Sequence, residues 1–387
     1  MSDHHHLPRR DLLKFAALGG AMLVAPRMAL AAVETDSRFV FIIQRGAADG
    51  LNIVIPYADP DYAKLRGALA IDPARATKLD GQFALHPALV QAAAMYGQKQ
   101  AIFVHATASP YRDRSHFDGQ NVLETGGTAP YAVRDGWLNR LVGLLPKARD
   151  EAIAFAPTVP PALRGPAEVA SYAPSALPQP TDDLLLRVGR LYQADPQLHP
   201  LWEAAREARG MAADENAGRA PADLGKLAAS FLSRPDGPRI AMLETGGWDT
   251  HTGQDFRLTA QLKALDQMLA ALRDGLGDTW SKTVVVVATE FGRTAAANGT
   301  GGTDHGTGSA AMLFGGGLKG GRVIADWPGL AQAQLYQQRD LNATTGLDSV
   351  IAGLAAEAFG IEPDRVRRTL FAQAPASRPL EGLLQRA

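Results

Sequence analysis

The sequence predicts an α/β protein, a three-layer sandwich with a central, mostly parallel sheet. Two observations lead to this class. Short apolar runs rich in β-branched residues alternate with helical stretches, which is the pattern of a parallel sheet with helices on both faces. Several of these runs also end in a polar loop, and in an open α/β sheet such loops meet at the carboxyl edge of the strands.

The composition narrows the class of protein. The chain has 387 residues, of which 46% are hydrophobic and 20% charged, values that are ordinary for a globular protein. Its net charge of −1 gives no indication of a nucleic-acid partner. Because the chain has no cysteine, disulfides, zinc–thiolate sites and thiol catalysis are excluded.

Residues 1–31 are predicted to be an export signal and not part of the fold. Arg9 and Arg10 stand before the apolar run FAALGGAMLVA, and Ala29-Leu30-Ala31 offers small residues for a cleavage site. The run is too short for a permanent membrane anchor. The paired arginines favour the twin-arginine translocation machinery as a partner over an ordinary Sec signal. We therefore expect a periplasmic or extracellular protein.

From residue 36 to residue 387 we expect a single domain. Its predicted strands are 40–44, 101–105, 239–243 and 283–287, with a further apolar run, SAAMLF, at 309–314. Helices are predicted over 86–96 and 255–276, before the glycines at 126–127, and in the C-terminal tail. The alternation of these elements supports the parallel sheet.

An insertion is predicted at about residues 157–235. Prolines are dense from 157 to 180, so we expect little regular structure there. Residues 182–233 have helical periodicity in three pieces. We expect these helices to pack beside the sheet.

Four polar loops carry the candidate site residues. They are Asp49 after the first strand; Arg112, Arg114, Ser115 and His116 after the second; Asp249 and His251 after the third; and Glu290, Arg293, Asp304 and His305 after the fourth. Nitrogen and oxygen ligands without sulfur suit zinc, manganese, magnesium or calcium, and imidazoles favour the transition metals. The sequence therefore predicts one or two divalent ions.

Several of these residues also have a structural interpretation. Asp49 precedes a glycine and alone would be a turn residue. Glu290 is equally suited to a metal and to an ion pair with Arg293. The guanidinium groups of Arg112 and Arg114 suit a phosphate or sulfate oxyanion, or a solvated cluster balanced by nearby acids.

Two pairs give a stronger indication of a metal site. The Asp-x-His spacing of Asp249 and His251 lets both side chains reach one ion, and the preceding glycines expose their loop. Asp304 and His305 lie next to each other between glycines.

Five segments identify a family resemblance: RGAADGLN, SHFDGQNVLETG, GGWDTH, ATEFGRT and GTDHGTGSAAMLFGGGLKGG. With these segments the chain resembles the bacterial domain-of-unknown-function 1501 family over nearly the whole mature length. That family is related to the alkaline phosphatase and sulfatase superfamily, whose members hydrolyse phosphate or sulfate esters over one or two metals. The resemblance implies an alkaline-phosphatase-like sandwich.

The resemblance also implies roles for the metal ligands. Asp49 matches a ligand of one metal, and Asp249 with His251 matches ligands of the second. Glu290 stands where the superfamily has Asp followed by His, and here the next residue is Phe291. His305, with Asp304 beside it, resembles the late histidine ligand.

The position of the superfamily nucleophile falls on His116, with Ser115 as its neighbour. We therefore expect an exported metal-dependent hydrolase of a small anionic phosphate or sulfate ester or glycan, with Ser115, His116 and Arg293 in catalysis. Arg112 and Arg114 would bind the substrate. The alternative is a non-catalytic binding protein on the same fold that holds an anionic ligand or partner, because the usual nucleophile is absent.

Overall fold

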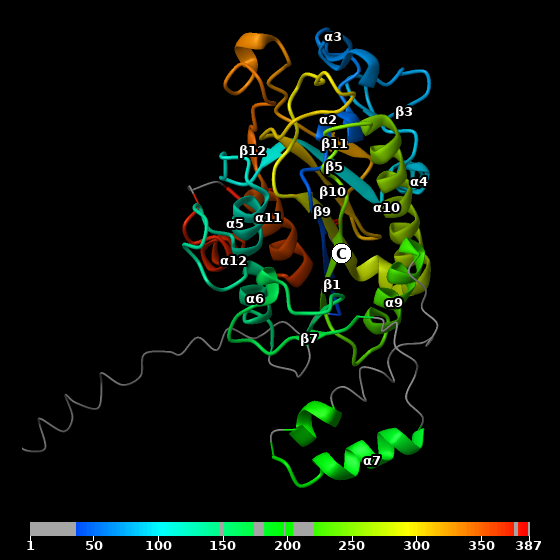
Figure 1. Cartoon of the computed structure of the whole chain (residues 1–387), viewed down its shortest axis with the longest axis vertical. Coiled ribbons are helices and arrows are strands. Elements are labelled where there is room, and N and C mark those ends of the chain that lie inside the picture. Colours follow the sequence, from blue (N-terminus) through cyan, green and yellow to red (C-terminus); the bar gives the residue numbers. More distant parts are fainter. Residues whose placement is uncertain are drawn as a thin grey trace, which may run out of the picture. The chain divides into compact units, whose positions relative to one another are not determined.

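The computed structural model describes residues 36–146, 151–173, 182–196, 198–203, 220–374 and 378–385 (Figure 1). The predicted export signal at 1–31 lies outside the described residues. Among the described residues, no helix has the length and apolar character needed to cross a membrane.

A nine-stranded sheet forms the centre of the described part of the chain, in the order β11-β5-β10-β9-β1-β8-β6-β7, with β12 paired to β5. Its strands are β1 (Arg38–Gln44), β5 (Ala101–Ala108), β6 (Ala152–Ala154), β7 (Ala170–Ser171), β8 (Ile240–Thr245), β9 (Thr283–Thr289), β10 (Ser309–Phe314), β11 (Arg322–Ile324) and β12 (Thr345–Gly346). Only β10 runs antiparallel to its neighbours, so the predicted mostly parallel sheet is confirmed.

Helices cover both faces of this sheet. One face carries α6 (Trp137–Val142), α11 (Leu347–Phe359) and α12 (Pro363–Leu370). The other carries α4 (Val90–Gly97), α9 (Pro221–Leu232) and α10 (Gln254–Leu276), which lie on the opposite side in Figure 1. This is the predicted three-layer arrangement.

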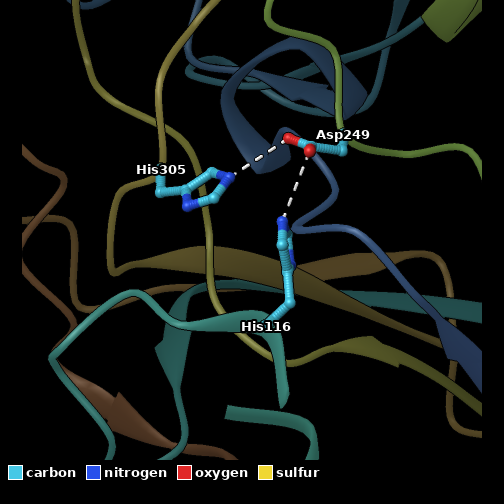
Figure 2. A group of neighbouring side chains, drawn as sticks. All are labelled: His116, Asp249 and His305. Atoms are coloured by element: carbon cyan, nitrogen blue, oxygen red, sulfur yellow. Dashed lines mark hydrogen bonds and ion pairs between the residues drawn. The ribbon is translucent and has the colours of Figure 1, made fainter. Parts of the chain in front are cut away.

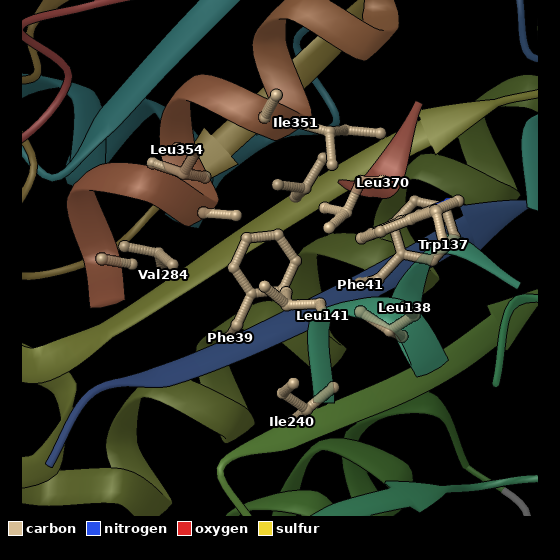
Figure 3. Close-up of a cluster of buried hydrophobic side chains, with 14 of the residues drawn as sticks. Phe39, Phe41, Trp137, Leu138, Leu141, Ile240, Val284, Ile351, Leu354 and Leu370 are labelled. Carbon is tan, nitrogen blue, oxygen red and sulfur yellow. The ribbon is translucent and has the colours of Figure 1, made fainter. Parts of the chain in front are cut away.

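The central strand β1 shows why the strands are apolar throughout. All seven of its residues are buried, and successive side chains point to opposite faces. Phe39 and Phe41 pack with Trp137 and Leu141 on one face (Figure 3), whereas Val40 belongs to the apolar cluster of the other face. A parallel sheet buried on both sides requires this continuous apolar run.

The α4 helix begins later than the sequence predicts, at Val90 and not at residue 86. His86 precedes Pro87, and a residue before proline is disfavoured in the helical conformation. Instead, the backbone of His86 donates to Ile53, and its ring Nδ1 accepts a bond from Ala88.

The stretch predicted as an insertion holds several described elements. They are a 3-10 turn (Pro161–Leu163), the edge strand β7, the helix α7 (Asp182–Tyr192) and α9. The proline-dense part thus has two short regular elements where little was expected. The third helical piece becomes α9, which packs on α10 so closely that a Cβ at Gly225 would lie 2.3 Å from the carbonyl oxygen of Met268.

The remaining elements are short. They are α2 (Gly50–Ile53), which follows β1, α3 (Tyr62–Arg66), α5 (His116–Thr125), which follows β5, and a small antiparallel sheet of β2 (Val54–Ile55), β3 (Thr77–Lys78) and β4 (Ala84–Leu85). Further 3-10 turns occupy Gly67–Leu69, Gly277–Lys282, which directly precedes β9, and Gln332–Gln334.

Candidate metal centre

The central strands end side by side. Gln44, the last residue of β1, is in register with Thr245 of β8 and Thr289 of β9. The strand β5 runs in the same direction as β9, since both are antiparallel to β10. The loops that follow β1, β5, β8 and β9 therefore start from one edge of the sheet, as the sequence predicts.

Three side chains from three of these segments meet at this edge. His116 is the first residue of α5, Asp249 follows β8, and His305 precedes β10. One ligand atom from each lies within 4.8 Å of the others. Figure 2 shows the two imidazole rings directed at the carboxylate of Asp249, with Nε2 of His305 3.2 Å from Oδ1 and Nε2 of His116 3.5 Å from Oδ2.

A fourth side chain, His251, stands beside this group. Its Nε2 lies 3.0 Å from Oδ1 of Asp249 and 3.0 Å from Nε2 of His305. The His251 side chain is 42% exposed, against 24% for His116 and 25% for His305. It is therefore the imidazole most accessible to solvent.

The Nδ1 atom of each imidazole contacts an oxygen acceptor. His116 Nδ1 lies 2.9 Å from Oε1 of Glu290, and His251 Nδ1 lies 3.2 Å from Oδ1 of Asp304. His305 Nδ1 lies 2.9 Å from the backbone carbonyl of Arg114. Since these oxygens only accept when the carboxylates are ionised, each Nδ1 carries a proton, and the neutral ring has its lone pair on Nε2.

The Nε2 atoms of the three histidines show whether these residues suit a metal ion. The Nε2 lone pairs of His251 and His305 face each other and a carboxylate oxygen at 3.0–3.2 Å, an arrangement that is repulsive without a cation or an added proton. Nε2 of His116 is buried without a hydrogen-bond partner, because Asp249 at 3.5 Å is beyond normal hydrogen-bonding distance. Two or three imidazoles and one carboxylate are a typical zinc donor set. The residues therefore fit a transition metal.

Glu290 positions His116. Its carboxylate is fully buried and also accepts from Gln120 and from the backbone N–H of Gly46. Burial opposes ionisation, but the hydrogen bonds from His116 and Gln120 hold the pKa of Glu290 below its ordinary value. The same hydrogen bond raises the pKa of His116, although burial opposes that shift.

The other two members of the group have lowered pKa values. Burial, with the nearby His116, lowers the pKa of His305. For Asp249, burial acts in the opposite direction, but the hydrogen bond from Arg293 lowers its pKa. A deprotonated histidine and an ionised aspartate are the forms that bind a metal.

A Glu290→Gln substitution is expected to weaken metal binding by roughly 10–100-fold, the usual cost of losing a carboxylate that orients a ligating histidine. The neutral amide keeps the shape but removes the charge that fixes Nδ1 of His116 as the donor. Competition titration with a chromogenic zinc chelator measures the affinity. Gln120→Ala, which removes only a second donor to the same carboxylate, is the control and should have a smaller effect. Wild-type affinity in Glu290→Gln would contradict this role.

Arg293 lies inside the site with its side chain fully buried. Its Nη1 donates to Oδ1 of Asp249 at 2.6 Å, while Nε and Nη2 donate to Thr303. It holds the aspartate in place, and Glu290 pairs with His116 and not with Arg293.

Asp49 is placed in a separate network. Both of its oxygens contact the buried guanidinium of Arg66, at 2.6 and 2.9 Å, and Gln254 donates to Oδ2. Asp49 also caps α2 by accepting from Leu51. Its role as a metal ligand stays a prediction.

The two arginines expected to bind substrate contact the protein itself. Arg112 donates to the backbone carbonyls of Ser109 and Tyr111. Arg114 forms an ion pair with Asp340 at 2.7 Å. The backbone of Arg114 has a φ of 62°, a strained left-handed conformation, and its carbonyl contacts His305.

Ser115 stands at the amino end of α5, immediately before His116. Its side chain does not cap the helix, and its backbone N–H is held by the hydroxyl of Tyr111. The nucleophilic role expected for Ser115 stays a prediction.

Two glycines of the GTGGTDHG segment allow the loops to approach. A Cβ on Gly302 would lie 2.3 Å from the backbone of His251, and one on Gly306 would lie 2.3 Å from the backbone of Arg293. Only glycine permits this approach, which brings Asp304 and His305 to the site.

Sequence reasoning missed Arg66, Gln254 and Thr303. Gln254 links two networks, since its amide donates to Asp49 and its carbonyl oxygen accepts from Thr303, a partner of Arg293. No local pattern marks these residues, because each acts through partners that are distant in the chain.

A family model described as "Protein of unknown function (DUF1501)" matches residues 36–370. No curated protein matches the sequence.

Solved structures with a similar fold include a protein in the alkaline phosphatase superfamily from Vibrio parahaemolyticus, at 11% identity and a TM-score of 0.44, with 88% of this chain and 71% of that chain covered. The zinc complex of the C-terminal periplasmic domain of EcEptC from Escherichia coli matches at 10% identity and a TM-score of 0.42, covering 89% and 88%. The phosphonate monoester hydrolase SpPMH from Silicibacter pomeroyi matches at 13% identity and a TM-score of 0.40, covering 88% and 78%.

Proposed function

This chain belongs to the DUF1501 family, and we propose that it is an exported metal-dependent hydrolase of phosphate or sulfate esters. The observation that carries the proposal is the convergence of His116, Asp249 and His305, whose ligand atoms lie within 4.8 Å of one another. The export component rests on the paired arginines and apolar run of residues 1–31.

In this proposal His116, Asp249 and His305 hold one divalent ion, which leaves a coordination position open, as is usual in catalytic sites. When bound, the ion would act as a Lewis acid towards the ester oxygens. Glu290 and the carbonyl of Arg114 keep the two histidines in the tautomer needed for binding. Arg293 holds the carboxylate of Asp249.

We assign proton transfer to His251. Its exposed ring is held by Asp304, and its Nε2 points to the ion-binding group. Protonated at Nε2, it would donate to the departing alcohol oxygen as the ester bond breaks, while Asp304 stabilises the imidazolium. The attacking group is water or the Ser115 hydroxyl, and turnover by a Ser115→Ala variant decides between them.

The test is metal analysis of the purified mature protein combined with turnover of 4-nitrophenyl phosphate and 4-nitrophenyl sulfate. We expect bound metal, loss of turnover after chelation, and recovery when zinc or manganese is restored. If the purified protein binds no divalent ion, the proposed metal site is contradicted. If it binds metal but turns over neither ester, the proposed hydrolase activity is contradicted.

The second candidate is a non-catalytic binding protein that holds an anionic ligand or partner. The position of His251 supports it, because with Nε2 3.0 Å from both Asp249 and His305 this ring could act as a fourth ligand. Four protein ligands would make a closed, structural site. Bound metal that needs His251 and gives no turnover is the result expected for this candidate.

A further inference from the structure

A cavity of about 610 Å³ lies along α5, next to the candidate metal centre. Gln120 connects the two, because it lines the cavity and also donates to Oε1 of Glu290, the carboxylate that holds His116. His116 is immediately followed by Phe117, which also lines the cavity. A molecule bound here would therefore lie against the hydrogen-bond chain that runs from Gln120 through Glu290 to His116.

Two exposed aromatic rings form part of the cavity wall. Phe117 is 82% exposed and Tyr131 is 66% exposed. Tyr131 is nevertheless held at its backbone, since its N–H donates to the Oδ1 atom of Asn121 at 2.7 Å. Its φ of 59° is a strained backbone conformation of the kind that concentrates at functional sites. The protein thus holds a ring in solvent, as a stacking surface requires.

Three arginines contribute charge to the same cavity. Arg45 is neutralised within the protein, because it pairs with Glu124 at 2.8 Å and Glu244 at 2.5 Å. Arg134 and Arg164 are exposed, and no ion pair of either is found among the described residues; Arg164 donates from Nε to the carbonyl of Val159, which leaves its two terminal nitrogens. These two guanidinium groups are therefore available for a carboxylate, phosphate or sulfate.

We propose that this cavity binds the ring of an anionic sugar, with the ring on Tyr131 and Phe117 and a charged substituent on Arg134 and Arg164. The inference rests on the proposed hydrolase, for which it names the substrate class. The substrate would be a sugar ester that carries a second anionic group beside the one that reaches the metal. The cavity would then recognise the sugar that carries the ester and leaves as the alcohol product.

Calorimetric titration of the metal-loaded mature protein tests this, with glucuronate and glucose 6-sulfate as charged probes and glucose as the neutral reference. We expect the Arg134→Ala/Arg164→Ala double variant to bind both charged sugars about tenfold more weakly, with glucose little changed. Tyr131→Ala should weaken all three. Arg368→Ala, which removes an exposed arginine on α12, is the matched control and should bind as the wild type does.

Wild-type affinity in the double variant would overturn the inference. Equal weakening in Arg368→Ala, or no sugar binding by the wild type, would also overturn it. These results are independent of catalysis, because binding is measured without turnover. If sugar binding depends on the arginines but the protein has no esterase activity, the sugar site is supported and the proposed hydrolase is contradicted. If the protein has esterase activity but sugar binding does not depend on the arginines, the hydrolase is supported and the sugar site is contradicted.

Discussion

Replacing Arg66 with alanine is expected to lower the free energy of unfolding by about 3–5 kcal/mol, the usual cost of leaving a buried charge without its partner. Arg66 and Asp49 are 0% and 1% exposed and form a two-armed ion pair. Without the guanidinium, the Asp49 carboxylate keeps only the amide of Gln254 and the N–H of Leu51. Neither donor supplies a positive charge.

Urea denaturation followed by linear extrapolation measures this loss. Arg368→Ala removes an exposed ion pair with Glu362, in which the nitrogen and oxygen lie 3.7 Å apart, and should change stability by less than about 1 kcal/mol. The double variant Arg66→Met/Asp49→Asn removes both charges and should be more stable than Arg66→Ala. If Arg66→Ala lowers the free energy of unfolding no more than Arg368→Ala does, this prediction is contradicted, and water must solvate the Asp49 carboxylate in place of Arg66.

Replacing His251 with alanine is expected to lower the turnover number by roughly 10²–10⁴-fold, the range for a lost general acid. Metal content should stay that of the wild type, because His116, Asp249 and His305 remain. Steady-state kinetics on an aryl ester and metal analysis of the same preparation give both readouts. Lost turnover with unchanged metal content would indicate that His251 transfers a proton, whereas lost metal would indicate that it is a ligand.

Asp304→Asn is the conservative comparison for this prediction. It keeps the imidazole of His251 and removes the negative charge 3.2 Å from its Nδ1, so the loss of turnover should be smaller. If His251→Ala loses the metal, His251 is a ligand and the site is closed. That result would contradict the proposed proton transfer and favour the binding protein.

The strands and their common edge were accessible from the sequence. Each of the four predicted strands is found as β1, β5, β8 or β9, because a strand buried on both faces must be apolar along its length. The two-residue strand β7 and the late start of α4 were not predicted, because short edge strands and His-Pro turns leave little periodic signal. The edge on which His116, Asp249 and His305 meet followed from parallel topology.

The partner of each polar side chain was not accessible in this way. Asp49, Asp249 and Glu290 are all acids in loops after strands, and their surroundings in the sequence do not distinguish their roles. In the structure the first pairs with Arg66, the second faces three histidines and Arg293, and the third holds His116. Hydrogen bonds act over about 3 Å, so a displacement of a loop by one residue would change every partner.

The sequence by itself therefore determined the layers, the order of strands and loops, and the residue types available for metal chemistry, because apolar burial and glycine turns are local patterns. Only the tertiary structure decided which acid neutralises an arginine and which orients a histidine. It also decided that an exposed tyrosine and three arginines line one cavity along α5. These outcomes depend on contacts between segments as far apart as Asp49 and Gln254, which no local pattern encodes.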